Sequence, residues 1–310
     1  MTKAWKPEMT PGSTSLFSDP FSDDSPLLYR EGEGKALILL NRPRRCNAFS
    51  LSLLEELRRR LILLEGRSDL RVLLIAGAGG RFSSGLDLAE AASKGTVDVE
   101  TASDPFPLTA ALEGKISEMF PEGEKEGSRK VPLGFRMPWL VAEILLRLAA
   151  VSQAVIGVGR GSAFGGGGAL LASCDIALAE PSVRFGFPEC RRGIAPTLLH
   201  PFLEGRVAPR GLAPFLLTGG SFDAAEAFRL GLVDELAAEG EGAARAERLA
   251  DEILAGAPER VREVKKLFRA PDRALTRRAA DGLLRHWESW NEPAAAEGIA
   301  AFLEKRGPRW

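Results

Sequence analysis

Short apolar runs alternate with amphipathic stretches along the first two thirds of the chain. The runs are four to six residues long and rich in leucine, isoleucine and valine, which is typical of buried β-strands. They cover residues 35–40, 71–76, 155–158 and 176–179. Between the first two runs, leucines recur at helical spacing from about Ser50, a residue suited to the helix N-cap. Strand, helix and strand at this spacing predict a parallel pair of strands.

From Pro209 onwards the pattern becomes helical. It predicts a short helix over 223–230 that begins at Asp223 and ends at Gly231. Three further helices are expected, over 242–255, 258–269 and 272–290. We therefore expect a core over 27–205 and a helical C-terminal region over 206–310.

Two segments lack a clear period. Residues 1–26 are rich in Ser, Pro, Asp and Thr and predict a disordered leader. Residues 93–131 mix Pro, Gly, Glu and Lys and predict a loop, followed by an amphipathic helix over 138–150. Such a loop can act as a lid over a site, and it can equally be a solvated insertion without a role.

Two glycine-containing turns each follow an apolar run directly. One spans 82–88 and the other spans 161–168, just before a predicted helix that includes Ala169–Ala172. Glycine lets a backbone approach closely, and a helix N-terminus favours negative charge. Two such turns can form a two-donor oxyanion site. Each turn taken alone is equally compatible with a tight bend and nothing more.

Composition narrows the class of protein. The chain has 310 residues, 45% of them hydrophobic, and a net charge of −1, which gives no support for binding to nucleic acid or to a membrane surface. We see no apolar run of transmembrane length and no signal peptide. Cys46, Cys174 and Cys190 lack the spacing of a metal site, so we expect no metal and a reducing, cytoplasmic environment.

Several ordered motifs, between about residues 28 and 270, resemble the crotonase (enoyl-CoA hydratase/isomerase) superfamily. They are Leu40–Pro43 with Asn47-Ala48, Phe82–Leu88, Gly161–Gly167, Cys174–Ala177, Phe185–Glu189, Leu217–Gly220 with Phe222–Ala227, and Gly231–Asp234. The resemblance implies an α/β fold, a spiral of ββα units with a helical C-terminal part. It also implies acyl-CoA thioester substrates, no cofactor beyond that coenzyme A, and a homotrimer or dimer of trimers. The chain departs from the family by an insertion at about 93–138.

The resemblance also implies a set of catalytic groups. Family members hold a thioester oxyanion with two backbone N–H groups, which correspond here to those of Leu86 and Gly166. Hydratases add two glutamates. The second corresponds to Glu189, but Ala169 stands at the position of the first, and alanine cannot transfer a proton. Leu86 can also narrow the acyl pocket.

A replacement carboxylate could come from the insertion. Glu143 is the leading candidate, with Glu113 and Glu118 behind it, although each is also compatible with a solvated helix charge. We expect His286 on a surface-facing helix, and His200 cannot be placed from sequence. For coenzyme A, the resemblance points to Arg44 or Arg45, Ser84 and Asp87, and further to Lys265 and Lys266.

One acid/base carboxylate is compatible with moving a double bond and, less simply, with hydration. We therefore expect an acyl-CoA enzyme of the hydratase/isomerase type. A thioester hydrolase, a decarboxylase and a non-catalytic acyl-CoA-binding protein remain alternatives.

Overall fold

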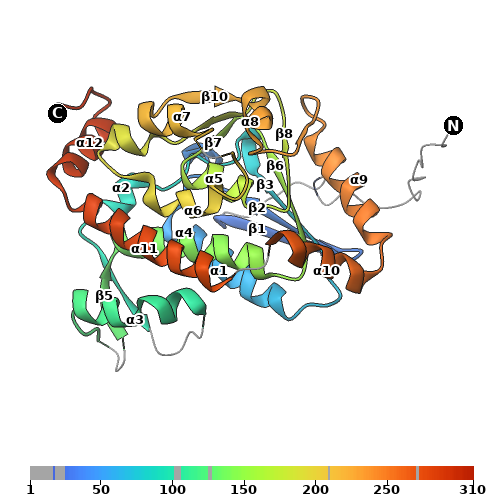
Figure 1. Cartoon of the computed structure of the whole chain (residues 1–310), viewed down its shortest axis with the longest axis horizontal. Coiled ribbons are helices and arrows are strands. Elements are labelled where there is room, and N and C mark those ends of the chain that lie inside the picture. Colours follow the sequence, from blue (N-terminus) through green and yellow to red (C-terminus); the bar gives the residue numbers. More distant parts are fainter. Residues whose placement is uncertain (1–16, 18–24, 101–105, 125–127, 209, 270–271) are drawn as a thin grey trace.

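The computed structural model describes residues 17, 25–100, 106–124, 128–208, 210–269 and 272–310. Its centre is a six-stranded sheet in the order β1-β2-β3-β6-β8-β11 (Figure 1). These strands are β1 Leu27–Gly32, β2 Lys35–Leu40, β3 Val72–Gly77, β6 Ala154–Gly159, β8 Ile176–Ala179 and β11 Glu235–Leu236. β1 and β2 form an antiparallel hairpin, whereas every other neighbouring pair is parallel. The four apolar runs are therefore strands, and the predicted parallel pair is confirmed.

Alternate residues of these strands point to opposite faces of the sheet, and each face packs against a different helix. Ile38 and Ile75 face α1 (Leu51–Glu65), whose leucines are buried in the same cluster. Leu37 and Leu74 face α9 (Gly242–Leu254) on the other side. The sheet is thus covered on both faces, as expected for buried parallel strands.

A smaller three-stranded sheet carries the second glycine turn. Its order is β10-β9-β7, with β7 parallel and β10 antiparallel to β9. Its strands and the short helices around them are β7 Ser162–Phe164, α5 Gly166–Ala172, β9 Arg184–Gly186, α6 His200–Leu203, α7 Ala213–Thr218, β10 Ser221–Asp223 and α8 Ala224–Leu230. Asp223 caps α8 as predicted, since its side chain accepts from the Glu226 N–H.

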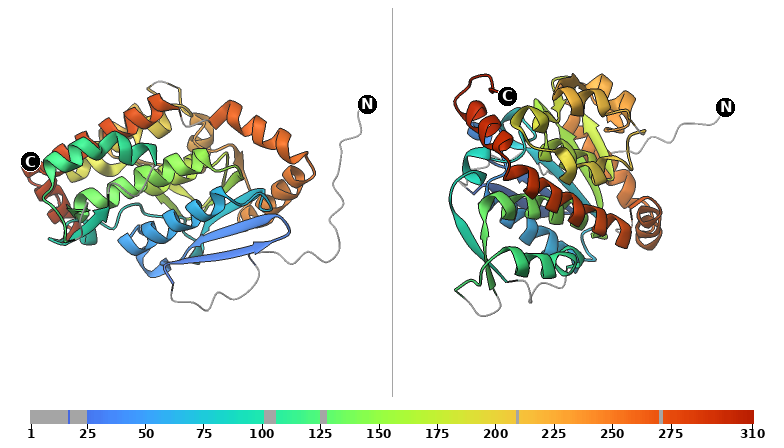
Figure 2. Two further views of the ribbon diagram at one scale, coloured as in Figure 1. Left: turned by 90° about the horizontal axis from the view of Figure 1, so that it is seen from below. Right: turned by 60° about the vertical axis from the view of Figure 1, so that its left-hand side comes forward.

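The loop predicted over 93–131 is wrong. Its described residues form two paired strands, β4 (Thr96–Glu100) and β5 (Ser128–Pro132), and a helix, α3 (Pro107–Met119). α3 buries Leu108, Leu112 and Ile116, so the helical period was present in the sequence but masked by polar neighbours. The helix predicted over 138–150 begins earlier, since α4 spans Leu133–Ala150. Figure 2 shows α4 alongside α1.

The predicted C-terminal helices are confirmed within a residue or two. They are α9, α10 (Pro258–Arg269) and α11 (Arg273–Trp290). A further helix, α12 (Pro293–Leu303), was not predicted. Short 3-10 turns complete the described elements: η1 Pro43–Arg45, η2 Ala78–Gly80, η3 Pro188–Arg192 and η4 Pro196–Leu198.

Helices as long and apolar as a membrane span requires do not occur in the described part of the chain. The leader predicted over 1–26 falls almost wholly outside the described residues.

Candidate active site

A cleft with a volume of about 1110 Å³ lies where both glycine turns, η3 and the C-terminal helices meet. Residues from each of these elements line it, including Leu86, Gly166, Glu189, His286 and Phe302. The cleft therefore collects groups from widely separated stretches of the chain, among them both glycine turns and Glu189, which were singled out from the sequence.

The first glycine turn is locked to the second by backbone hydrogen bonds. The Ser83 N–H donates to the Ser162 carbonyl at 2.8 Å, and the Phe164 N–H donates to the Ser83 carbonyl at 3.0 Å. Gly85 has a positive φ of 83°, and a Cβ placed on it would lie 2.7 Å from the Phe164 carbonyl oxygen and 3.2 Å from the Gly166 nitrogen. Only glycine permits this approach, so the two turns meet directly.

The same contact leaves two backbone donors at the cleft wall. Hydrogen bonds on either side of Leu86 join Phe49 to Gly85 and Asp87, so its own N–H is left over. Gly166 is the first residue of α5, where an N–H has no partner within the helix. Among the described residues neither N–H makes a hydrogen bond, and both residues line the cleft. This arrangement can hold an oxyanion.

Glu189 stands at the start of η3 with its carboxyl group packed against the glycine turn. A Cβ on Gly165 would lie 2.7 Å from its Oε1, and within the described part of the chain its buried Oε2 has no hydrogen-bond partner. Burial raises the pKa of this carboxyl to about 7, against smaller lowering effects of its own backbone N–H and of the Arg192 guanidinium. A carboxyl that is half ionised near neutral pH suits proton transfer.

No second carboxylate accompanies it from the positions expected. Ala169 is fully buried in α5. Glu143 is 1% exposed, but it faces α1 rather than the cleft, and its Oε1 accepts from Arg58 at 2.6 Å and Arg147 at 2.8 Å. The proposed replacement role of Glu143 is therefore wrong, because both guanidinium groups hold it as a structural ion pair. Glu113 and Glu118 are exposed on α3, away from the cleft lining.

The surface position expected for His286 is also wrong. His286 is 7% exposed and lines the cleft together with Trp290, one helical turn further along α11. Burial lowers its pKa to about 4, which the backbone of Ala195 only partly opposes. The i, i+4 spacing of His286 and Trp290 was the available signal, but the sequence did not show which face of the helix is buried. His200 is instead 60% exposed and pairs with Glu204.

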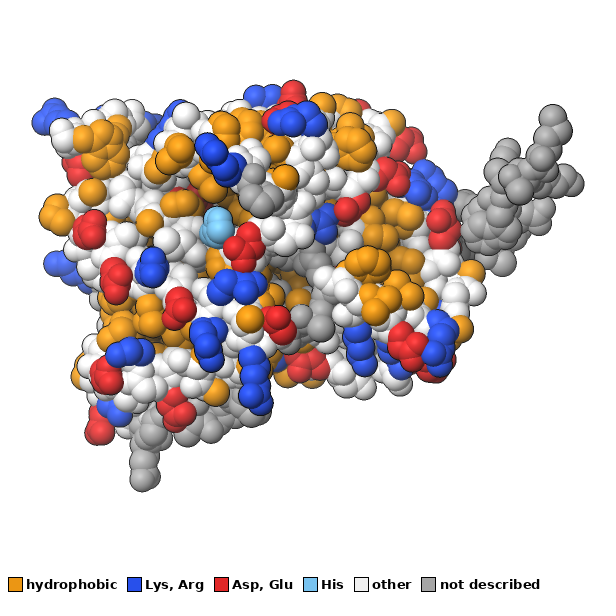
Figure 3. Space-filling view, in the orientation of Figure 1, with side chains coloured by type: hydrophobic (Ala, Val, Ile, Leu, Met, Phe, Trp, Pro, Cys, Tyr) orange, Lys and Arg blue, Asp and Glu red, His pale blue; other side chains and the backbone are white. Residues whose placement is uncertain are grey.

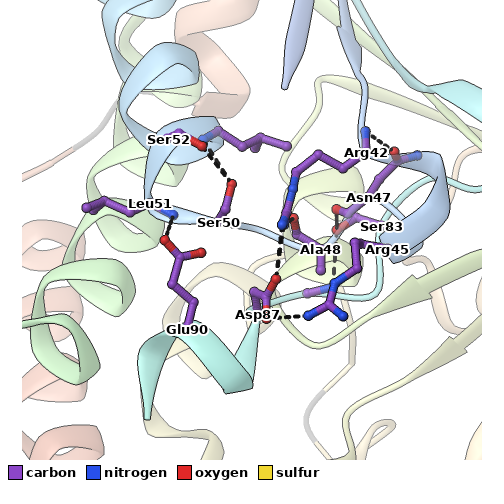
Figure 4. Close-up of polar contacts among 12 residues, drawn as sticks. Arg42, Arg45, Asn47, Ala48, Ser50, Leu51, Ser52, Ser83, Asp87 and Glu90 are labelled. Atoms are coloured by element: carbon purple, nitrogen blue, oxygen red, sulfur yellow. Dashed lines mark hydrogen bonds and ion pairs between the residues drawn. The ribbon is translucent and has the colours of Figure 1, made fainter. Parts of the chain in front are cut away.

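A polar network beside the first turn orients Arg42, which precedes η1, and Arg45, which ends it (Figure 4). Asp87 is buried and pairs with Arg42 at 3.2 Å and with Arg45 at 3.4 Å. Asn47 accepts from the Arg42 N–H and donates to the carbonyls of Ala78 and Arg81. Arg44, Arg45, Ser84 and Asp87 all line the cleft, and their contact with coenzyme A stays a prediction.

Lys265, which was also predicted to bind coenzyme A, does not line the cleft. Its ammonium donates to the carbonyls of Leu148 and Gln153 at 3.1 and 2.7 Å and pairs with Asp175 at 2.8 Å. An ammonium has three protons, so these partners saturate it and tie α10 to the sheet. Lys266 is exposed on the same helix and does not line the cleft. Cationic groups that the sequence did not suggest do line it: Arg191, Arg192, Lys305 and Arg306.

Comparison with known proteins identifies the family of the chain. The family model for enoyl-CoA hydratase/isomerase matches residues 30–112 and 137–310, so the chain belongs to this family. The unmatched segment, 113–136, lies inside the insertion recognised from the sequence.

The chain is 31% identical to the mitochondrial enoyl-CoA hydratase domain-containing protein 3 of Danio rerio, over 93% of this chain and 89% of that protein. It is 28% identical to the short-chain-enoyl-CoA hydratase of Clostridium acetobutylicum, over 89% and 94% of the two chains. The structure resembles that of an enoyl-CoA hydratase from Mycobacterium avium, with a TM-score of 0.69, 26% identity and coverage of 93% and 100%. The crotonase-type α/β fold with a helical C-terminal part is thereby confirmed.

Proposed function

We propose that this protein is an acyl-CoA enzyme that stabilises a thioester enolate with the N–H groups of Leu86 and Gly166 and moves protons with one carboxylate, Glu189. The observation that carries the proposal is that the buried Oε2 of Glu189 and two backbone donors of the same cleft have no hydrogen-bond partners among the described residues. The names of two relatives, a short-chain-enoyl-CoA hydratase and an enoyl-CoA hydratase domain-containing protein, support the choice of substrate class.

In the proposed reaction the thioester carbonyl oxygen lies between the two N–H donors. Glu189 takes a proton from the acyl chain; the C–H bonding pair moves into the chain, and negative charge develops on the carbonyl oxygen. The donors are fixed before the reaction, so they stabilise that charge without reorganisation. The proton then returns from Glu189 to a different carbon, which moves a double bond.

Isomerisation is the form of the reaction that the site supports best. Ala169 and the ion-paired Glu143 leave Glu189 as the one carboxylate of the cleft that is available to the acyl chain among the described residues. Hydration by the usual route needs a second group to activate water, and a single carboxylate can instead shuttle one proton between two carbons. The alternatives, hydrolysis and decarboxylation, release free coenzyme A or carbon dioxide and are therefore separable by product.

The coenzyme A moiety is proposed to lie along the basic side of the cleft. Arg44, Arg45 and Ser84 border the first turn there, and Lys305 and Arg306 face the cleft from the chain's C-terminal end. Arg45 is 59% exposed and is oriented by the buried Asp87, so its guanidinium can reach a phosphate without losing its position.

A homotrimer or a dimer of trimers is proposed from an apolar surface outside the cleft. Leu267 and Phe268 on α10 are each 80% exposed, and Val264 lies one turn before them. Figure 3 shows apolar side chains gathered over this part of the molecule. Such a patch marks a protein interface more often than free surface, and light scattering after size exclusion would give the oligomer.

The three cysteines are free thiols, which suits the cytoplasmic location we propose.

The test is exchange of the acyl α-proton. Wild type and Glu189→Gln are incubated with saturated and enoyl-CoA esters in D2O, and deuterium uptake is followed by mass spectrometry. We expect Glu189→Gln to lower exchange by at least about a hundredfold, because proton transfer by a placed group contributes that much. Glu118→Gln, an exposed carboxylate, serves as the matched control. Binding without exchange in wild type would contradict the proposal.

A further inference from the structure

One wall of the cleft is almost wholly apolar. It is formed by α4, η4 and α11, and α11 packs against each of the other two. The side chains they contribute are Pro138, Val141, Pro196, Leu198, His286 and Trp290. Apart from the Trp290 indole, His286 is the one polar side chain on this wall within the described part of the chain.

His286 lacks the partners that a buried polar group normally has. Neither Nδ1 nor Nε2 makes a well-formed hydrogen bond to any described residue, although the side chain is 7% exposed, and the backbone of Ala195 supplies only a weaker polar contact. A buried polar group that lacks a hydrogen bond lowers the stability of the fold. Buried polar groups rarely lack a hydrogen bond, so we expect the His286 ring to form one with a molecule that enters the cleft.

The protonation state of His286 limits what that partner can be. Burial lowers the pKa of the ring to about 4, so the imidazole is neutral at pH 7. A neutral imidazole offers one donor and one acceptor. A hydroxyl group can pair with either nitrogen, since it can donate to the unprotonated one or accept from the protonated one. A carboxylate accepts only and favours the imidazolium form, which this apolar wall disfavours.

The insertion holds His286 in place. Trp287, the next residue on α11, packs edge-on against Phe120 and Phe135 with ring centroids 6.0 and 5.5 Å apart. A Cβ on Gly134 would lie 2.6 Å from Nε1 of Trp290, so that glycine lets the indole pack against the start of α4. All three of these supporting residues lie in the segment 113–136, which the family model does not match. The insertion thus fixes the face of α11 that borders the cleft.

We propose that His286 is a specificity-determining residue that binds a hydroxyl group on the acyl chain, so that the preferred substrates are acyl-CoA thioesters bearing a hydroxyl beyond the reacting carbons. The inference rests on the proposed function in one respect, that an acyl-CoA ester occupies the cleft. It does not depend on Glu189 or on which reaction follows.

The test measures binding rather than turnover. Saturated esters are used in matched pairs, such as 4-hydroxypentanoyl-CoA with 4-methylpentanoyl-CoA and 5-hydroxyhexanoyl-CoA with 5-methylhexanoyl-CoA. Dissociation constants are measured by titration calorimetry for wild type, His286→Phe, His286→Gln and His200→Phe. In wild type we expect at least one hydroxyl ester to bind about tenfold or more tightly than its methyl partner.

His286→Phe should abolish that preference by weakening the hydroxyl ester while leaving the methyl ester unchanged. His286→Gln keeps a donor and an acceptor and should retain part of the preference, which also covers the case that the phenylalanine variant fails to fold. His200→Phe, at the exposed histidine, should change neither constant. A purely structural role of His286 would weaken both esters alike.

Two failures are distinguishable. If wild type binds CoA esters without preferring any hydroxyl partner, or if His286→Phe weakens both members of a pair equally, the inference about His286 is overturned and the proposed function stands. If the preference is present but α-proton exchange is absent, the role of Glu189 fails and His286 keeps its assignment. If no CoA ester binds at all, both are overturned.

Discussion

Two glutamates whose carboxyl groups are shielded from solvent lie in different regions of this molecule and differ in their hydrogen-bond partners. Glu143 lies between α1 and α4, where Arg58 and Arg147 both donate to its Oε1. Glu189 lies at the cleft wall, where its Oε2 has no hydrogen-bond partner among the described residues. Sequence placed both as candidate acid/base groups. The difference lies in the partners, because the carboxylate of Glu143 is held by two guanidinium groups, whereas the Oε2 of Glu189 is left to accept a proton.

The comparison shows that burial alone does not mark a catalytic carboxyl. The pairing of Glu143 joins two helices that carry no chemistry, and Arg147 extends the network to Glu65 at 2.7 Å. The pKa of Glu189 is raised because nothing compensates its burial fully. The presence of a charged partner therefore distinguishes the structural carboxylate from the reactive one. The substitutions that follow test this distinction.

The largest effect is expected at the structural carboxylate. Glu143→Gln leaves Arg58 and Arg147 without their shared anion in a buried place, which should lower the free energy of unfolding by about 4 kcal/mol. Urea denaturation measures this loss. The α-proton exchange rate of the folded variant should stay within about twofold of wild type, and a large loss of exchange would show that Glu143 also serves the cleft.

Glu189→Gln should raise the stability of the fold, and it should do so only at pH values above the ordinary pKa of a glutamate. The folded pKa of about 7 exceeds the ordinary 4.5, so ionisation costs the wild-type fold progressively more between pH 4.5 and 7. Glutamine removes that cost, and the variant should gain up to about 3 kcal/mol over wild type at pH 8 relative to pH 4.5. Urea denaturation at the two pH values tests this, with Glu118→Gln as a control that should show no such difference.

The two-donor site should be sensitive to a single methyl group. In Gly85→Ala the new Cβ would press on the Phe164 carbonyl and displace Gly166, so exchange should fall about a hundredfold, the usual loss when one oxyanion donor is misplaced. Gly80→Ala is the control, because Gly80 also has a positive φ, 70°, but open space around its Cα. Equal losses in both variants would point to backbone strain rather than to the donors.

The smallest effect is expected at the basic rim. Arg45→Gln removes an exposed cation, so the affinity for CoA esters should fall a few-fold, and the salt dependence of binding should become weaker. Arg59→Gln removes a similarly exposed arginine from α1 and should change neither. Calorimetric titration at two salt concentrations measures both.

Much of the fold was predictable because its core follows simple periods. The strands at 35–40 and 176–179 are uninterrupted apolar runs, and the leucines of α1 mark one helix face, so both elements were placed from the sequence. The insertion was misread as a loop because polar residues, glycines and prolines separate its apolar positions. α12 was missed because its run of alanines has no contrasting polar face.

The candidate site was predictable where it rests on the backbone. Glycines indicate where two backbone segments can approach each other closely. The turns at 82–88 and 161–168 were therefore recognised from the sequence, and the structure brings them together. Side chains on helices were harder to assign. Glu143, Lys265 and His286 are each compatible with several orientations in the sequence, and only tertiary packing decides that the first two form ion pairs while His286 reaches the cleft.

The most direct test of the central claim is the pH dependence of proton exchange. Acyl-CoA deuterated at the α carbon is incubated with wild type between pH 4 and 9, and loss of deuterium to water is timed. The unprotonated form of Glu189 is the base, so the rate should rise with pH, reach half its maximum near pH 7 and then level off. A rate that is half-maximal near pH 4.5, or one that Glu189→Gln leaves unchanged, would contradict the account.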